Sequence, residues 1–378
     1  MLGGGYDSPD SRGWQGDLYD GGWVGSMTTE PVRWALAGYG PGGRTFHAPL
    51  IRSAAGMDLV AVLTGSPERQ EQARADSPAT VIVPALADLP ALGVAGVTIT
   101  TPNTTHAPLA HEALDLGLHV VMDKPFALSG AEAADLVAHA ERVGRTVVPY
   151  QNRRWDSDLL TIRRLLDEGA LGRVHRFTSR FDRFRPVKSG WHGASVAEGG
   201  GVLLDLGPHL VDQATHLFGP VVAVHADLQT VRTGAGAEDQ VELHLTHESG
   251  VRCTLAAGLA SAAPGPRFQV NGDRAGFVID GFDIQEQQLK AGHSPASLAD
   301  GWGVEPESAW GRLYYGDLAA PVPSERGAWD SYYPAVARAV QGLDDPPVAA
   351  RDAIATARVL DAARESAAER TVVLLRPD

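Results

Sequence analysis

The fold of this chain is decided by the stretch Val32-Arg33-Trp34-Ala35-Leu36-Ala37-Gly38-Tyr39-Gly40-Pro41-Gly42-Gly43. Residues 32–37 form a short apolar run of the kind found in buried parallel strands. The glycines at 38, 40 and 43 fit the spacing G-x-G-x-x-G, and a helical stretch follows to about residue 55. Between a strand and a helix, this spacing is typical of dinucleotide-binding loops, whose backbone closely approaches a pyrophosphate.

Strand and helix patterns alternate from this loop to residue 150. Apolar runs predict further strands at 58–63, 80–83, 97–100, 119–122 and 146–150. The stretches between them predict helices near 67–75, 106–116 and 129–143. Such alternation predicts an α/β domain over 30–150 with a doubly wound parallel sheet of the Rossmann type.

The pattern changes after Gln151. Period-2 runs predict strands at 173–181, 221–232, 239–247, 251–258 and 267–280, and a final strand at Thr371–Leu375. Helices are expected near 157–168, 330–341 and 351–367, whereas the Pro- and Gly-rich stretch 292–327 shows no clear pattern. We therefore expect a second, α+β domain over 151–378 with a mostly antiparallel sheet that exposes one face.

Composition excludes several functional classes. The chain has 378 residues, 44% of them hydrophobic, and a formal net charge of -14. An acidic balance argues against nucleic acid as a partner, and the single cysteine, Cys253, excludes disulfides and a cysteine-built metal site. We expect no metal at all. No apolar run approaches the roughly 18 residues that span a membrane.

Residues 1–29 are expected to be a disordered extension. They are rich in glycine and aspartate and contain no apolar segment of the kind found in secretory signals. The cytoplasm is therefore the expected compartment.

The end of the second strand indicates the preferred cofactor. NAD sites often carry an acid about 20 residues after the glycines, where it binds the ribose 2′-hydroxyl. Here the position reads Thr64-Gly65-Ser66-Pro67-Glu68-Arg69, with no acid at the strand tip. Ser66 and Arg69 are suited to a 2′-phosphate, so we favour NADP over NAD. In the alternative, Ser66 only caps the helix that Pro67 opens, and Arg69 is solvated.

Two further motifs add a family resemblance. Thr101-Pro102-Asn103-Thr104-Thr105-His106 follows one expected strand, and Asp123-Lys124-Pro125 follows the next. With the glycine loop, they resemble the Gfo/Idh/MocA family of glucose–fructose oxidoreductases and inositol dehydrogenases, although that family usually has Glu-Lys-Pro. The resemblance covers about 30–378. It implies a C-terminal domain whose large open sheet mediates homo-oligomers, and a possible cis bond before Pro125.

Three segments look most like the branch that holds scyllo-inositol dehydrogenases. They are Phe46-His47-Ala48-Pro49, Gln151-Asn152-Arg153-Arg154-Trp155, and Gly199-Gly200-Gly201 followed by Asp205-Leu206-Gly207-Pro208-His209. The resemblance implies a cyclic polyol or sugar as substrate.

Lys124, Asp205 and His209 are the predicted catalytic residues. Oxidation of a secondary alcohol needs a base that titrates near the working pH, and a free imidazole does so near about 6.5. Asp205 lies four residues before His209, so on one helix the two would share a face, although Pro208 disturbs that helix. Lys124 ends a strand at the carboxyl edge of the sheet, where its ammonium would polarise the substrate oxygen.

The remaining site residues follow from their positions beside these motifs. For the cofactor we predict Gly38, Tyr39, Gly40, Gly43, Thr64, Ser66, Arg69, Thr101, Pro102, Asn103, His106, Asp123 and Lys124. For the substrate we predict Gln151, Asn152, Arg153, Arg183, Trp191, Asp205 and His209. Structural alternatives stay open for several of them, such as a helix-start role for His106 and interdomain pairing for the residues that follow Tyr150.

Three functions remain after this reasoning. The main hypothesis is an NAD(P)-dependent dehydrogenase of a cyclic polyol or sugar. A cofactor-using glycosidase of the same fold would oxidise its substrate transiently, with no net consumption of NAD(P). A non-catalytic sensor could lose the lysine or the histidine, and this chain keeps Lys124 and His209.

Overall fold

The computed structural model describes residues 30–186 and 194–376. The expected disordered extension 1–29 and the predicted substrate residue Trp191 lie outside this range. Residues Pro31–Asp378 form one compact unit. Within it the chain passes from a first sheet to a second one near residue 150.

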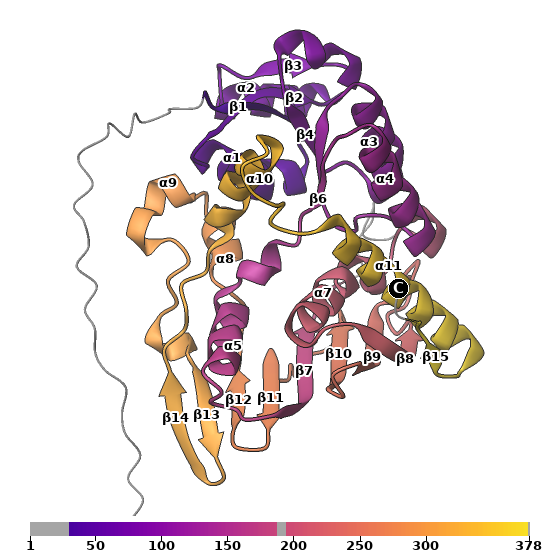
Figure 1. The fold of residues 1–378 in the computed structure, drawn as a ribbon, viewed down its shortest axis with the longest axis vertical. Coiled ribbons are helices and arrows are strands. Elements are labelled where there is room, and N and C mark those ends of the chain that lie inside the picture. The colour runs from indigo at the N-terminus through magenta and orange to yellow at the C-terminus, as the bar shows by residue number, and fades with distance from the viewer. Residues whose placement is uncertain (1–29, 187–193, 377–378) are drawn as a thin grey trace, which may run out of the picture. The chain divides into compact units, whose positions relative to one another are not determined.

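Among the described residues, six strands form a parallel sheet in the order β3-β2-β1-β4-β5-β6 (Figure 1). The strands are β1 (Val32–Ala37), β2 (Met57–Leu63), β3 (Val81–Val83), β4 (Gly96–Ile99), β5 (His119–Met122) and β6 (Val147–Pro149). The helices between them are α1 (Ala48–Ser53), α2 (Pro67–Asp76), α3 (His106–Asp115) and α4 (Gly130–Arg142). This confirms the predicted doubly wound sheet.

The strand order of this sheet places the ligand edge. β1 pairs with β2 on one side and with β4 on the other, so the chain reverses direction across the sheet at β1. Ligands of open α/β sheets bind outside the carboxyl ends of the strands at such a switch point. Gly38 follows β1 and Thr100 follows β4, so both motifs begin at this edge.

A second sheet of nine strands lies in the C-terminal part of the described chain, in the order β14-β13-β12-β11-β7-β10-β9-β8-β15. Its strands are β7 (Val174–Asp182), β8 (Val221–Gln229), β9 (Gln240–His247), β10 (Arg252–Gly258), β11 (Phe268–Gly272), β12 (Gly276–Ile279), β13 (Gly311–Tyr315), β14 (Leu318–Val322) and β15 (Val373–Leu374). β10 pairs with β7 in parallel, and the other neighbours are antiparallel. The predicted mostly antiparallel sheet is therefore confirmed.

Two details of this sheet differ from the prediction. The run 267–280 was expected to be one strand, but it folds into the hairpin β11–β12, because the chain turns at Asp273 and Arg274. The stretch 292–327, which showed no pattern, holds the hairpin β13–β14. Residues 318–321 of β14 are exposed and include Pro321, so this edge strand shows no alternation of apolar and polar residues.

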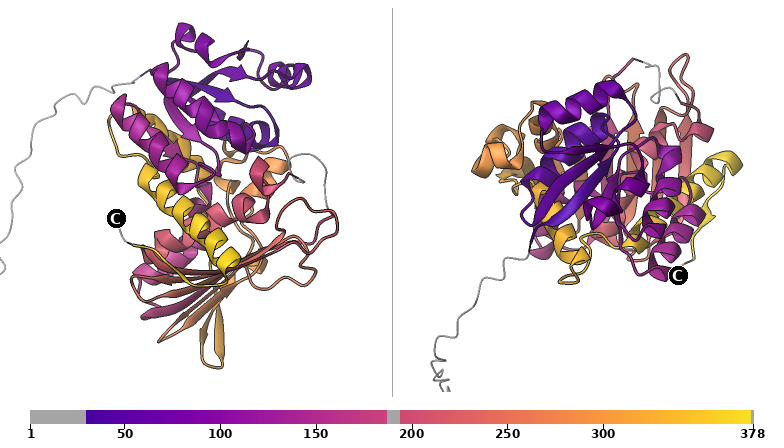
Figure 2. Two further views of the ribbon diagram at one scale, coloured as in Figure 1. Left: turned by 90° about the vertical axis from the view of Figure 1, so that its right-hand side faces the viewer. Right: turned by 90° about the horizontal axis from the view of Figure 1, so that it is seen from above.

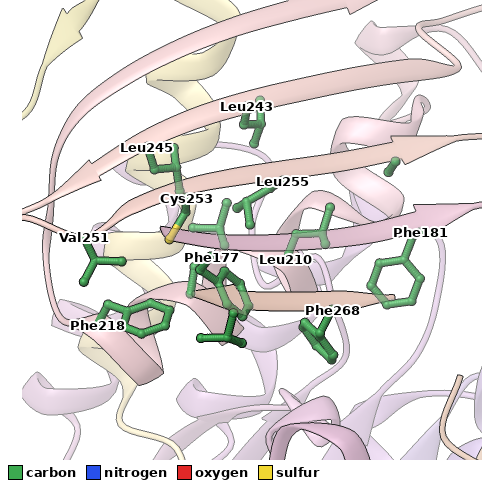
Figure 3. Close-up of a cluster of buried hydrophobic side chains, with 14 of the residues drawn as sticks. Phe177, Phe181, Leu210, Phe218, Leu243, Leu245, Val251, Cys253, Leu255 and Phe268 are labelled. Atoms are coloured by element: carbon green, nitrogen blue, oxygen red, sulfur yellow. The ribbon is translucent and has the colours of Figure 1, made fainter. Parts of the chain in front are cut away.

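One face of the large sheet is covered by helices. These are α5 (Ser157–Asp167), α7 (Gly207–Phe218) and α11 (Ala350–Glu369), and Figure 2 shows them on the same side of the sheet. Figure 3 shows part of the apolar layer beneath them, with Phe177, Leu210 and Leu255. In the described part of the chain, no helix covers the opposite face, which is the exposed face predicted from the alternation.

Arg154 joins elements that are far apart in the sequence. Its Nε and Nη2 donate to Asp212 of α7 at 2.8 and 2.6 Å, and its Nη2 also donates to Asp352 of α11 at 2.9 Å. α11 in turn packs along α4 of the first sheet (Figure 2). Arg154 and Asp212 are both buried, so each compensates the charge of the other.

Replacing Arg154 by methionine is expected to destabilise the fold by about 3–5 kcal/mol, because Asp212 would remain buried without its partner. Burial raises the pKa of Asp212, and Arg154 opposes that rise. Without Arg154 the folded pKa moves further above the unfolded one, so the deficit should grow as the pH rises above the ordinary pKa of a carboxyl. Urea unfolding at several pH values measures this.

The control is Arg142→Met on the exposed end of α4, which should change the unfolding free energy by less than about 0.5 kcal/mol. A loss below about 1 kcal/mol for Arg154→Met would contradict the assigned role.

Candidate active site

The glycine loop leaves no room for side chains at two of its positions. Gly38 has a φ of +99°, and a Cβ on Gly43 would lie 2.0 Å from the Gly38 carbonyl oxygen. The chain then enters a π-helical turn, Gly42–His47 (η1), which runs into α1. The result is a narrow backbone cradle at the start of a helical segment, which fits the phosphates of a dinucleotide.

Arg69 lies beside this cradle. A Cβ built on Gly40 would be 3.6 Å from the Arg69 Cζ, which places the guanidinium over the loop. Ser66 accepts a hydrogen bond from the Arg69 backbone nitrogen at 3.4 Å, so it caps α2 as the alternative for this residue expected. Thr64 is buried and accepts from the Ser66 nitrogen. The cradle therefore carries a cation beside its second glycine.

Tyr39, a predicted cofactor residue, is turned into the protein. Its ring is buried, and its hydroxyl donates to Asp76 Oδ2 at 3.0 Å at the end of α2. The side chain thus fixes the loop against α2.

His106 connects the two motifs that follow β4 and β5. Its Nε2 lies 2.8 Å from the Thr101 carbonyl oxygen, and its Nδ1 lies 2.9 Å from the Pro125 carbonyl oxygen. Both ring nitrogens therefore face the backbone, and the side chain positions the loops that carry Asn103 and Lys124. His106 begins α3, as the structural alternative expected.

Lys124 and Asp205 form the central ion pair of the site. The Lys124–Pro125 bond is cis, as the resemblance implied. Lys124 Nζ lies 2.6 Å from Asp205 Oδ1 and donates to the Asp205 carbonyl oxygen at 2.9 Å. Both side chains are only partly exposed. The pair joins the edge of the first sheet to the segment that precedes α7.

The geometry of Asp205 and His209 differs from the prediction. Asp205 ends the short helix α6 (Val202–Asp205), whereas His209 lies in α7. Leu206 separates the two helices with φ −114° and ψ −26°, so the residues do not share one helix face. The break arises because Gly207 and Pro208 favour a new helix start over a continuous turn.

His209 is buried, and its Nδ1 has no hydrogen-bond partner among the described residues. Its pKa lies well below the ordinary value because of burial first, and then because of the positive charges of Arg153, Lys124, Arg267 and Arg183. At neutral pH the ring is therefore uncharged and able to accept a proton.

His47 is a site residue that the sequence reasoning missed. Its Nδ1 lies 2.7 Å from the Tyr333 hydroxyl, and its Nε2 lies 3.6 Å from Asp123 Oδ1. Asp123 also accepts from the Lys124 backbone nitrogen at 2.8 Å. Burial opposes ionisation of Asp123, but His47 and Lys124 outweigh it, so the pKa of this carboxyl is lowered. The Phe46–Pro49 motif was the available signal for His47, whereas nothing in the sequence pointed to Tyr333.

The residues after β6 are buried beside these groups. Arg153 pairs with Asp156 at 3.2 Å and with Glu286 at 2.6 Å, so its charge is already matched within the protein. The buried side-chain atoms Tyr150 Oη, Gln151 Oε1 and Arg153 Nε have no hydrogen-bond partner among the described residues. Asn152 is also buried. Unpartnered buried polar atoms are costly, so several converging here fit a site that holds water or ligand.

A pocket with about 780 Å³ of empty space, its open mouth included, brings several predicted residues together. Its lining includes Asn103, Arg183, Asp205 and the run Gly199–Gly201. Asn103 Nδ2 donates to the Gly199 carbonyl oxygen at 2.8 Å, so the loop after β4 meets the glycine run. Gly201 has a φ of +99°, and a Cβ there would lie 2.2 Å from Glu238 Oε1.

Comparison with known proteins identifies the family. Residues 32–151 match the model of the oxidoreductase family with an NAD-binding Rossmann fold, and residues 159–278 match the GFO/IDH/MocA C-terminal domain. The chain belongs to the Gfo/Idh/MocA family.

Relatives of this Gfo/Idh/MocA protein span nearly its whole length. The oxidoreductase YdgJ of Escherichia coli is 37% identical, covering 92% of this chain and 99% of YdgJ. The scyllo-inositol 2-dehydrogenase (NADP(+)) IolW of Bacillus subtilis is 32% identical, and the match covers 93% of this chain and 98% of IolW. A solved structure of YvaA from Bacillus subtilis superposes with a TM-score of 0.85 at 31% identity, covering 92% and 99%.

Metal-ligating clusters and membrane-spanning helices are absent from the described residues. No group of three or more His, Cys, Asp or Glu side chains there is arranged to hold a metal ion. No described helix is long and apolar enough to cross a membrane.

The lowered pKa of His209 predicts how pH acts on this family member. The unfolded chain binds a proton at this residue below about pH 6.5 and the folded one does not, so folding stability should fall as the pH drops below that value. The variant His209→Gln should lose less folding stability at acid pH than the wild type does. Urea unfolding between pH 5 and pH 8 measures it.

His293→Gln in an exposed loop is the control and should keep the wild-type acid loss. An equal acid loss in His209→Gln and wild type would show that His209 titrates normally.

Proposed function

We propose that this Gfo/Idh/MocA oxidoreductase is an NAD(P)-dependent dehydrogenase that acts on a secondary alcohol of a cyclic polyol or sugar, with NADP as the favoured cofactor. One observation carries the proposal: Lys124, at the carboxyl edge of the sheet where the dinucleotide cradle also begins, pairs with Asp205 and acts on the buried, uncharged His209. The relative named as an NADP-dependent scyllo-inositol 2-dehydrogenase supports the cofactor and the substrate class.

The residues divide the work of oxidation as follows. A bound nicotinamide cofactor supplies the carbon that accepts the hydride. Lys124 donates a hydrogen bond to the substrate oxygen and stabilises the negative charge that develops there. His209 takes the hydroxyl proton, which its uncharged state at neutral pH allows. Asp205 holds the Lys124 ammonium in place at 2.6 Å.

Two other proposals concern partners and compartment. The uncovered face of the nine-stranded sheet is the surface we expect to pair with a second copy of the chain, which would bury its strands on both sides. We also keep the cytoplasm as the expected compartment.

The proposed function is tested by cofactor titration followed by a substrate screen. NADP+ and NAD+ are titrated separately by the quenching of tryptophan fluorescence. Inositols and aldoses are then screened for reduction of the tighter-binding cofactor, followed by nicotinamide absorbance. Net reduction supports the dehydrogenase. Turnover of a glycoside without net reduction would support the glycosidase, and failure to bind either cofactor would contradict both.

Arg69→Gln should weaken NADP+ binding about tenfold, or about 1.4 kcal/mol, because the guanidinium beside Gly40 pairs with the 2′-phosphate. The affinity for NAD+, which lacks that phosphate, should change little. Arg74→Gln on the exposed side of α2 is the matched control. Equal weakening of both cofactors would show that Arg69 does not select between them.

Lys124→Ala should lower kcat by about 10²–10³, far more than it weakens cofactor binding, since its ammonium acts on the reacting oxygen. Steady-state kinetics and the cofactor titration measure the two effects separately. Full turnover of the true substrate by this variant would exclude the assigned role.

A further inference from the structure

The pocket wall carries two arginines whose side chains form no ion pair with a described acid. Arg183 and Arg185 follow β7, and both line the pocket. The Arg183 side chain makes no hydrogen bond or ion pair with a described residue; its Cζ lies 5.5 Å from the Phe282 ring centroid and 6.0 Å from that of Phe181. Burial lowers the pKa of Arg183, so its charged form lacks sufficient compensation.

The other charges that line the pocket have partners. Arg232 Nε lies 2.8 Å from Asp239 Oδ2, and Asp205 is held by Lys124. Glu238 accepts a hydrogen bond from the Leu203 nitrogen. Among the described lining residues, Arg183 and Arg185 are therefore the cations whose side chains have no ion-pair partner.

Arg183 lies close to His209, one of the proposed reacting groups. Arg183 and His209 lie near the same aromatic ring, that of Phe181. The His209 ring centroid is 6.4 Å from the Phe181 ring centroid, and Arg183 Cζ is 6.0 Å from it. Arg183 is also one of the charges that act on His209. Both groups therefore lie around Phe181, and Arg183 also lines the pocket.

We propose that the substrate is a sugar or polyol that carries an anionic substituent, a carboxylate or a phosphate, which Arg183 binds and Arg185 attracts. The planar guanidinium offers paired N–H donors that suit either oxyanion. The inference rests on the proposed dehydrogenase function and specifies its substrate class. The cofactor phosphates do not account for Arg183, because their cradle is formed by the glycine loop and Arg69.

The test compares matched neutral and anionic ligands on the NADP+-saturated protein. The pairs are D-glucose with D-glucuronate, D-glucose with D-glucose 6-phosphate, and myo-inositol with myo-inositol 1-phosphate. Calorimetry gives the affinities, and NADPH formation gives kcat/KM. We expect at least one anionic member to bind tenfold or more tightly than its neutral partner, and that preference to fall as salt rises. The carboxylate and phosphate pairs distinguish the two sources of charge.

Arg183→Gln should lower the affinity for the preferred anionic ligand at least tenfold and leave that for its neutral partner within about twofold. Arg183→Lys keeps the positive charge but loses the paired N–H donors of the guanidinium. Its affinity for the anionic ligand should lie between those of the wild type and Arg183→Gln. Arg142→Gln on α4 is the control for a lost surface charge. Thermal unfolding of each variant, together with unchanged cofactor affinity, shows that the fold is intact.

Three results would overturn the inference: equal or better binding of every neutral partner, no effect of Arg183→Gln on anionic ligands, or no binding of any anionic ligand to protein that binds NADP+ normally. In each case the dehydrogenase proposal would stand, because it depends on cofactor binding and on net reduction. Wild-type protein that binds neither cofactor would instead overturn the proposed function, and this inference with it.

Discussion

The ion pair between Lys124 and Asp205 is the interaction on which the site depends. The ammonium comes from the carboxyl edge of the first sheet, and the carboxylate comes from the segment before α7, over the second sheet. At 2.6 Å and partly shielded from water, each group compensates the charge of the other. The pair therefore brings a cation to the carboxyl edge where the dinucleotide cradle begins, and this cation also acts on His209. The buried Arg154 and the helix α11 also connect the parts of the chain that carry the two sheets.

Burial and nearby charges give Arg153 and His209 different protonation states. Arg153 keeps its charge because Asp156 and Glu286 match it, whereas His209 loses its charge because it is buried among cations. A cluster rich in arginine thus produces a neutral base next to a positively charged hydrogen-bond donor. The same excess of positive charge favours an oxyanion on the substrate, so catalysis and substrate selection share one physical origin.

Much of the fold could be predicted because its signals are local. The parallel strands appear as apolar runs in the sequence. The glycine spacing after β1 predicts a loop without room for side chains, and a Cβ on Gly43 would indeed lie only 2.0 Å from the Gly38 carbonyl oxygen. The site was predictable where a motif follows a strand directly, as with Lys124. Where local signals compete the prediction was wrong, and where they are missing no prediction could be made. The helix shared by Asp205 and His209 breaks at Leu206, and the hairpin β13–β14 has exposed strands without alternation.

The sequence by itself determined the strand–loop–helix order, the cradle for a dinucleotide and the family, since each depends on residue types at short spacings. Only the tertiary structure decided which charges meet. The partner of His47 is Tyr333, 286 residues away, and the partner of Lys124 is Asp205, 81 residues away. Whether Arg183 is matched or His209 is charged depends on the sum of nearby charges and on burial. Both are properties of the packed molecule, because Coulomb energies follow distance in space and not separation along the chain.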